Sequence, residues 1–433
     1  MNVILISPEY NYPIWSEMYP NGALASLKAI ARSEGCGVYD IQMVADKFTL
    51  NMLLESIPIL NPEYIGITFT TFQTKSVKEI CRAIKSRFNI PIIAGGAHVS
   101  SVGASIVEDF TDIDIFVAGE GETVFRDILR GGYKNYKGRM YIKSNQFEKL
   151  DELPMPDYSL ENLSKFTGAP PPAARPSMFM MASRGCPSQC TFCNKAVYGS
   201  HVRYKSPDRV IQELRQLHVM GAKEVFFQDD TLNLNYEWLN EILDRIQSEK
   251  FGMVYRAPFR ANEKLISYSL LKKLRDTGFW LIFYGVESGD EQILKSVKKG
   301  LTIPEIERAF KLTQEAGIKT EASFIVGLPG ETHQTVQKSW GLYKRLKPFW
   351  VGFSAAVPFP NTELTKYGKV LDYDYDHYRF GAPLMETDEL SSSDIINYAN
   401  AFNKRVKRDK ILNILKDWRT TKWAFQRLGD YRR

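Results

Sequence analysis

Apolar segments with the length of a β-strand alternate with helical patterns along most of this chain, and this alternation limits its fold most. Strands that are connected through helices form parallel sheets whose faces are covered by those helices. In such a sheet the ligand lies beyond the carboxyl ends of the strands. The loops that follow the predicted strands are therefore the first candidates for a functional site.

The N-terminal part, residues 1–135, is predicted to be a Rossmann-like, doubly wound parallel sheet. Amphipathic helices are expected at about 21–33 and 75–88. Several loops after these strands contain paired glycines, which let the backbone approach a bulky ligand closely. The predicted strands are 2–7, 38–41, 64–69, 90–94 and 113–118. The candidate ligand-binding residues are Thr68, Phe69 and Thr70, then Gly95, Gly96 and His98, then Gly119, Glu120, Gly121 and Glu122.

A proline-rich stretch, residues 136–175, separates this sheet from a second series of strands and helices. Dense prolines hold a chain extended and block regular strand pairing, so this stretch is interpreted as a linker. Residues 176–365 then predict an incomplete (β/α)6 barrel, with its chemistry at the carboxyl ends of the strands. The predicted barrel strands are 178–182, 224–228, 254–259, 280–285, 321–326 and 350–355.

Three of the five cysteines, Cys186, Cys190 and Cys193, follow the first barrel strand at the spacing CxxxCxxC. A loop with glycine and proline can bring these sulfurs together, and thiolates bind iron–sulfur clusters or zinc. Three ligands for four irons leave one iron open to a substrate or cofactor. A zinc site completed by His201 is the alternative. A disulfide with an odd thiol is a third interpretation, although the cysteine usage fits a reducing compartment.

Composition describes a globular protein with 44% hydrophobic and 24% charged residues in a chain of 433. No apolar run approaches the ~20 residues of a membrane span. The chain opens directly with a strand and has no export leader, which predicts a cytoplasmic protein. The net charge of +6 is concentrated in residues 401–433, where a solvated amphipathic face is favoured over binding to phosphates or a membrane surface. No aromatic-interleaved module for nucleic acid is visible, so no nucleic-acid partner is expected.

The cysteine loop, with Phe192 directly before the third cysteine, resembles the cluster loop of the radical S-adenosylmethionine (SAM) enzymes. The resemblance implies a 4Fe-4S cluster on the three cysteines, whose open iron binds SAM. One electron then cleaves SAM to a 5'-deoxyadenosyl radical. Electrons would come from a donor such as flavodoxin or ferredoxin.

The same resemblance assigns SAM-binding roles to polar loops at the barrel rim. Each of these loops could instead be an ordinary turn or helix cap, and Arg260 an ordinary surface arginine. The implied residues are Phe192 near the cluster, Asp229 and Asp230 for the amino group, Arg260 for the carboxylate, Glu287 and Ser288 for the ribose, and Gly327 and Pro329 for the adenine.

The N-terminal part resembles the cobalamin-binding branch of that family at Gly66-Ile67-Thr68, Gly95–His98 and Gly119–Glu122. It lacks the DxHxxG motif of the cobalamin mutases. A scaffold that binds no cobalamin, or another small ligand, is therefore the alternative for this domain. The segment 366–433 is predicted to be mostly helical from residue 392, and either closes the mouth of the active site or packs as a cap.

The resemblance implies a cobalamin-dependent methyltransferase that modifies an unactivated carbon, or phosphorus, of a small-molecule substrate. The alternative is a radical SAM cyclase or rearrangement enzyme whose N-terminal domain delivers no methyl group. A non-enzymatic, zinc-stabilised binding module is a third hypothesis, and it predicts a colourless protein without iron.

Overall fold

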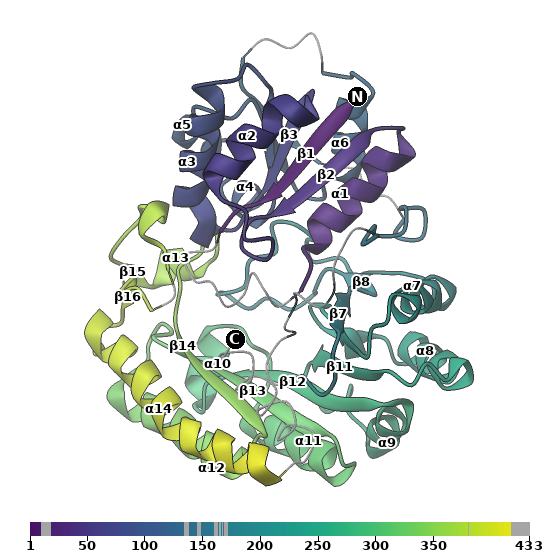
Figure 1. Ribbon diagram of the computed structural model, residues 1–433. Coiled ribbons are helices and arrows are strands. Elements are labelled where there is room, and N and C mark those ends of the chain that lie inside the picture. Colours follow the sequence, from purple (N-terminus) through teal and green to yellow (C-terminus); the bar gives the residue numbers. More distant parts are fainter. Residues whose placement is uncertain are drawn as a thin grey trace.

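Two lobes, each built on a six-stranded parallel sheet, form the molecule in the computed structural model (Figure 1). The structure describes residues 1–9, 19–133, 138–144, 149–159, 163, 166, 168, 172–379 and 381–416. The predicted fold class is confirmed, because a doubly wound sheet is followed by a partial barrel and a C-terminal helical segment.

The N-terminal sheet has the strand order β2-β1-β3-β4-β5-β6, with all neighbours parallel. From β1 the chain adds β2 on one side and β3 on the other, so the order in which strands are added reverses next to β1. Ligands bind at such switch points. All five predicted strands are present. The strands are β1 Asn2–Ser7, β2 Gly37–Gln42, β3 Tyr64–Thr68, β4 Ile92–Gly95, β5 Ile115–Ala118 and β6 Met140–Lys143.

Strand β6 falls inside the range that was predicted to be a linker. It pairs in parallel with β5, with Met140 opposite Ile115, so the sheet extends beyond residue 135. Only four residues long and half exposed, β6 carries a weak apolar pattern, which explains why it was not predicted.

Helices cover both faces of this sheet, as the alternating pattern predicts. Helix α1 begins after Asn21, whose side chain accepts hydrogen bonds from the backbone amides of Ala23 and Leu24. Helix α2 was not predicted, because its apolar residues surround the helix and Pro58 interrupts the pattern. The elements are α1 Gly22–Ser33, α2 Leu50–Leu60, η1 Thr71–Gln73, α3 Thr74–Lys85, α4 Ala97–Val102, α5 Ile106–Asp109 and α6 Glu122–Leu129.

The barrel sheet has the order β7-β10-β11-β12-β13-β14, so consecutive strands are neighbours. All six predicted strands are present, and β11 and β14 have the predicted bounds. Alternate residues such as Tyr255, Ala257 and Phe259 are buried against the outer helices. The strands are β7 Ser177–Met180, β10 Glu224–Phe227, β11 Val254–Phe259, β12 Phe279–Glu287, β13 Lys319–Val326 and β14 Trp350–Ala355. The helices are α7 Pro207–Val219, η3 Leu232–Leu234, α8 Tyr236–Glu249, α9 Tyr268–Thr277, α10 Glu291–Ser296, α11 Ile303–Glu315 and α12 His333–Leu346.

The C-terminal segment crosses from the barrel to the N-terminal lobe and returns as a long helix along the barrel (Figure 1). Helix α14 buries Ile395, Ala399 and Phe402, and the Phe402 ring lies 5.0 Å from that of Phe353 on β14. Its start at Ser392 agrees with the prediction, and the basic residues beyond 416 lie outside the described part. The smaller elements are α13 Leu364–Tyr367, β15 Lys369–Val370, η4 Tyr375–His377, β16 Met385–Glu386 and α14 Ser392–Lys416.

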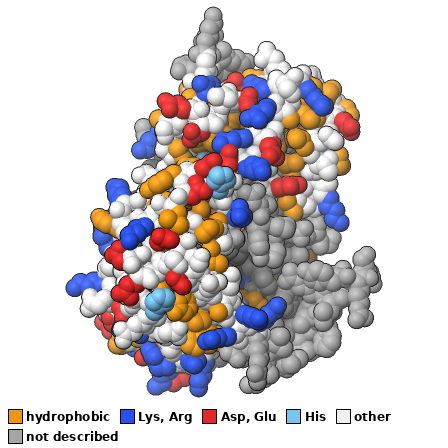
Figure 2. Space-filling model, turned by 90° about the vertical axis from the view of Figure 1, so that its left-hand side faces the viewer, with side chains coloured by type: hydrophobic (Ala, Val, Ile, Leu, Met, Phe, Trp, Pro, Cys, Tyr) orange, Lys and Arg blue, Asp and Glu red, His pale blue; other side chains and the backbone are white. Residues whose placement is uncertain are grey.

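The molecular face that carries this segment has acidic and basic side chains interspersed with apolar ones (Figure 2). Among the described helices, none is long and apolar enough to cross a membrane.

Candidate active site

The three cysteines lie in a loop that is closed at its base by a short antiparallel ribbon. Strands β8, Ser183–Arg184, and β9, Arg203–Tyr204, form this ribbon. Gly185 follows β8 with φ of +97°, and a Cβ there would lie 2.3 Å from the carbonyl oxygen of His201. Only glycine therefore fits between the ribbon and Cys186.

The three cysteines of the loop are free thiols. Desolvation of the Cys193 thiol, with smaller contributions from Cys190, Asp230 and Cys186, raises its pKa to about 11. In the described part of the chain, no group of three or more His, Cys, Asp or Glu residues is arranged to hold one metal ion. Three free thiols in one loop are the kind of donor that iron–sulfur clusters take, and each thiolate of a cluster binds a separate iron. His201 is not gathered with the cysteines as a Cys3His zinc site requires.

Asp229 and Asp230 follow β10 but face different surroundings. The buried Asp229 carboxylate accepts hydrogen bonds from the Ala182 amide, at 3.1 Å, and from the amide and hydroxyl of Ser183, both at 2.5 Å. Burial raises the pKa of Asp229 to about 6. Asp229 thus anchors the chain leading into the cysteine loop. Asp230 is exposed and accepts a hydrogen bond from the Gly185 amide. Its contact with the SAM amino group remains a prediction.

Arg260 connects the cysteine loop to another rim loop. Its guanidinium donates to the Ser188 hydroxyl at 2.9 Å, to the carbonyl of Gly300 at 3.1 Å, and to the carbonyl of Lys299. The arginine therefore fixes the position of the cysteine loop. Its predicted contact with the SAM carboxylate remains a prediction.

Glu287 and Ser288 are both buried but have different partners. Glu287 has a φ of +69°, and its carboxylate accepts a hydrogen bond from the Lys299 ammonium at 2.8 Å. Ser288 is fully buried, and its hydroxyl accepts from the Asp290 amide at 3.3 Å and lies 3.5 Å from the Ser339 hydroxyl. The structure turns Ser288 into the protein, so the predicted contact with the ribose does not fit this orientation.

Glu331 is a rim residue that the sequence did not single out. One carboxylate oxygen accepts from the amides of Gly327, at 2.6 Å, and Leu328, at 3.3 Å. The other oxygen is buried without a hydrogen-bond partner, and burial raises the pKa of Glu331 to about 8. Glu331 thus shapes the turn that contains Gly327 and Pro329. Phe192 of the cysteine loop packs against a small apolar cluster that contains Leu328, which brings the two loops together.

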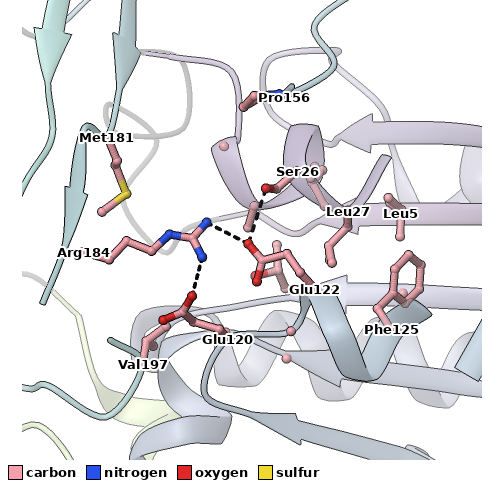
Figure 3. A pocket seen from close by; sticks show the side chains of 18 of the residues that line it. Leu5, Ser26, Leu27, Glu120, Glu122, Phe125, Pro156, Met181, Arg184 and Val197 are labelled. Carbon is pink, nitrogen blue, oxygen red and sulfur yellow. Dashed lines mark hydrogen bonds and ion pairs between the residues drawn. The ribbon is translucent and has the colours of Figure 1, made fainter. Parts of the chain in front are cut away.

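A cavity of about 370 Å³ lies between the two lobes, at the switch point of the N-terminal sheet (Figure 3). Its wall is mostly apolar and combines the glycine loops of the N-terminal lobe with Phe179, Met181 and Tyr198 from the barrel. The predicted ligand-binding residues that line it are Thr68, Gly95, Gly96, Gly119, Glu120, Gly121 and Glu122.

Three other predicted residues lie outside this wall. Phe69 is buried in the core of the lobe. Thr70 directly precedes η1, and its backbone amide donates to the side-chain oxygen of Gln73. His98 is fully buried, with its Nδ1 atom 3.1 Å from the Thr71 hydroxyl and its ring against Tyr375. Burial lowers the pKa of His98 to about 3. The residues after β3 and β4 enter η1 and α4, which turn these side chains away from the cavity.

Several residues of the cavity wall are glycines, so a ligand can approach the backbone closely there. At Gly96, with φ of +104°, a Cβ would lie 2.7 Å from the Phe69 carbonyl oxygen, so a side chain is excluded. Gly121 lines the cavity, and a Cβ there would make only an ordinary van der Waals contact, 3.9 Å from a methyl carbon of Leu27. Apolar walls with bare backbone segments suit a large, flat cofactor such as cobalamin.

Comparison with known families separates the N-terminal lobe from the barrel in the same way as the fold does. Residues 16–129 match the B12 binding domain, and residues 180–339 match the radical SAM superfamily. The first match covers the glycine loops, and the second covers the cysteine loop and most of the rim. The chain is a radical SAM enzyme with a B12-binding domain. Its cofactors are accordingly a 4Fe-4S cluster, SAM and cobalamin.

Individual proteins resemble this radical SAM enzyme along most of its length. An uncharacterized methyltransferase of Pyrococcus horikoshii is 29% identical over 424 residues, which cover 91% of this chain and 90% of that protein. The anaerobic magnesium-protoporphyrin IX monomethyl ester cyclase of Rubrivivax gelatinosus is 25% identical over 92% of this chain and 76% of that protein. The solved structure of OxsB, a cobalamin-dependent SAM radical enzyme, matches with a TM-score of 0.76 at 18% identity and supports the fold. That match covers 100% of this chain and 71% of OxsB.

Proposed function

We propose that this radical SAM enzyme transfers a methyl group to an unactivated carbon, or to phosphorus, of a small-molecule substrate. The observation that carries this proposal is that the cavity of the B12-binding domain reaches the cysteine loop. Arg184, two residues before Cys186, and Tyr198 within the loop both line the cavity. Cofactors bound at the two sites would therefore face a common space between the lobes.

The cofactors supply the reactive groups, and the protein supplies their placement. When bound, cobalamin provides a transferable methyl group and the cluster with SAM provides one-electron chemistry. The cysteines would hold the cluster, Asp230 would accept from the SAM amino group, and Glu287 would contact its ribose. Apolar residues such as Phe179 and Met181 would keep water from the space where the substrate reacts.

The test is an anaerobic reaction of the reconstituted enzyme with SAM that carries a deuterated methyl group. Reduced flavodoxin or ferredoxin would supply electrons, and candidate small molecules would be screened by mass spectrometry. A deuterated methyl group on the product together with 5'-deoxyadenosine is the expected result. Cys193→Ala, processed in parallel, is the control that should yield neither.

A cyclisation or rearrangement without methyl transfer is the second candidate, and the similarity to the cyclase over 92% of this chain favours it. In that case the same assay would give 5'-deoxyadenosine and an altered substrate, but no deuterium in the product. That outcome would reject methyl transfer while leaving the cofactor sites intact.

A further inference from the structure

A buried group of two arginines and two glutamates joins the two lobes beside the cavity. Arg184 donates to Glu120 at 2.5 Å and to Glu122 at 2.7 Å, as Figure 3 shows. Arg203 also pairs with Glu120. The side chains of these four residues are between 6% and 17% exposed. We call this set the interlobe ion-pair cluster.

The arginines of this cluster belong to the ribbon that closes the cysteine loop. Arg184 on β8 and Arg203 on β9 are directly opposite in the register of the two strands. Every cysteine of the candidate cluster site lies between them in sequence. The Arg184 guanidinium also lies 5.3 Å from the centre of the Tyr198 ring, inside the same loop. Glu120 and Glu122 therefore hold the base of the cysteine loop from the opposite lobe.

The glutamates of the cluster belong to the segment that shapes the cavity. Gly119, Glu120, Gly121 and Glu122 all contribute to the cavity wall. Glu122 additionally accepts from the Ser26 hydroxyl at 3.4 Å, so it also contacts α1, whose first turns line the cavity. A cofactor that fills the cavity must therefore restrain the same segment that holds the cysteine loop.

The ion pair between Arg184 and Glu122 depends on both of its buried charges being present. Burial alone would raise the pKa of Glu122, but the charge and hydrogen bond of Arg184, together with hydrogen bonds from the backbone and Ser26, outweigh burial, and this pKa is lowered. Removing one partner would leave a buried charge without compensation, which is costly. The interlobe ion-pair cluster thus fixes the cysteine loop and the cavity wall relative to each other.

We propose that Arg184 is a positioning residue that couples the two cofactor sites. Through Glu120 and Glu122 it transmits occupancy of the cavity to the cysteine loop, so cobalamin and the cluster stabilise each other's binding. The coupling must be reciprocal, because each ligand changes the affinity for the other by the same factor. This inference rests on the two cofactor sites and is independent of whether a methyl group is transferred.

The experiment measures how firmly the holoenzyme retains iron with and without hydroxocobalamin. Chelator is titrated anaerobically until half of the iron is removed from the full chain. In the wild type, cobalamin should raise that chelator concentration at least about fivefold, the lower end of ordinary coupling between sites. In Arg184→Met the ratio should fall to about one. Arg215→Met, which removes an exposed guanidinium from its pair with Glu249, should keep the wild-type ratio.

A second readout separates coupling from simple structural support. A purely structural role would weaken iron retention equally with and without cobalamin, and would leave the ratio unchanged. The electron paramagnetic resonance spectrum of the reduced cluster should change on adding cobalamin to the wild type but not to Arg184→Met. If Arg184→Met does not fold, Glu122→Gln tests the same contact with a smaller change. A ratio of about one in the wild type would overturn the coupling. So would an Arg184→Met or Glu122→Gln protein that keeps the wild-type ratio.

Discussion

The barrel rim and the cavity of the B12-binding domain prepare for their cofactors in opposite ways. At the rim, the predicted ligand-binding side chains are already bonded to other rim residues: Asp229 to Ser183, Arg260 to Ser188, and Glu287 to Lys299. In the cavity, four of the predicted positions that form the wall are glycines, which line it with backbone alone, and at Gly96 a Cβ would clash with the Phe69 backbone. The rim is thus a network that fixes loops, whereas the cavity is a volume that the backbone borders.

This difference separates the expected effects of substitution. A change at the rim acts by moving the cysteine loop, so it should affect the cluster and SAM first. A change in the cavity acts by occupying volume, so it should affect cobalamin first. The interlobe ion-pair cluster is the exception, because it joins the two sites. Outside that cluster, a variant that weakens both sites to the same extent would contradict the distinction.

The largest effect is expected from removing one cysteine ligand. Cys190→Ala should abolish cluster-dependent cleavage of SAM, because two thiolates do not replace three. Iron content and 5'-deoxyadenosine formation are the measurements. Cys81→Ala is the matched control, since Cys81 is buried on α3 in the core of the N-terminal lobe, and it should keep both. A Cys190→Ala protein with full iron and activity would reject the cluster site.

The next effect concerns the cavity. Gly121→Leu should lower cobalamin affinity about a hundredfold, because its side chain would fill the space that the bare backbone leaves open. Gly121 has a φ of −86°, so the substitution strains no backbone. Affinity is measured by absorbance titration of the full chain with hydroxocobalamin, and SAM binding should be retained.

His98→Phe is the contrasting variant in this experiment. His98 also belongs to a predicted cobalamin segment, but its side chain packs against Phe69 and Tyr375 outside the cavity wall. Its cobalamin affinity should match the wild type. If His98→Phe loses cobalamin and Gly121→Leu keeps it, the cofactor does not occupy this cavity.

A smaller effect is expected at Arg260. Arg260→Ala removes the hydrogen bonds that fix Ser188 and the carbonyl of Gly300, so SAM affinity should fall about tenfold. Cobalamin affinity should change much less. Calorimetric titrations of the cluster-loaded protein with SAM and with hydroxocobalamin compare the two. The reverse order of losses would show that the rim and the cavity are not separable in this way.

The sequence predicted local features well because they depend on neighbouring residues. Apolar strand segments gave all eleven expected strands, and cysteine spacing gave the loop between β8 and β9. Strand β6 was not predicted because its apolar pattern is short, and helix α2 was not predicted because its apolar residues surround the helix.

Side-chain direction was less predictable, because it depends on distant parts of the chain. Asp229 and Asp230 are adjacent, yet one faces Ser183 and the other approaches Gly185. The pairing of Arg184 with Glu120 joins residues 64 positions apart on different lobes. No spacing within the sequence indicates such a contact, so only the packed structure could show it.

The prediction for Glu331 concerns the stability of the fold and its dependence on pH instead of ligand binding. Its pKa rises from an ordinary 4.5 to about 8, so between these values the unfolded chain loses the proton while the folded chain keeps it. The contribution of Glu331 to stability is therefore fully present below about pH 4.5 and is lost as pH rises toward 8. From pH 6 to pH 8 the loss should be about 2 kcal/mol.

Glu331→Gln should flatten that dependence, because the amide oxygen can still accept from the amides of Gly327 and Leu328 without titrating. Urea unfolding of both proteins at pH 6, 7 and 8 measures the difference. Glu249→Gln, at an exposed pair with Arg215, should follow the wild type. Parallel curves for wild type and Glu331→Gln would mean that Glu331 ionises normally in the fold. The carboxyl would then reach solvent at the rim, and the turn of Gly327 and Pro329 would be shaped by a charged group instead of a protonated one.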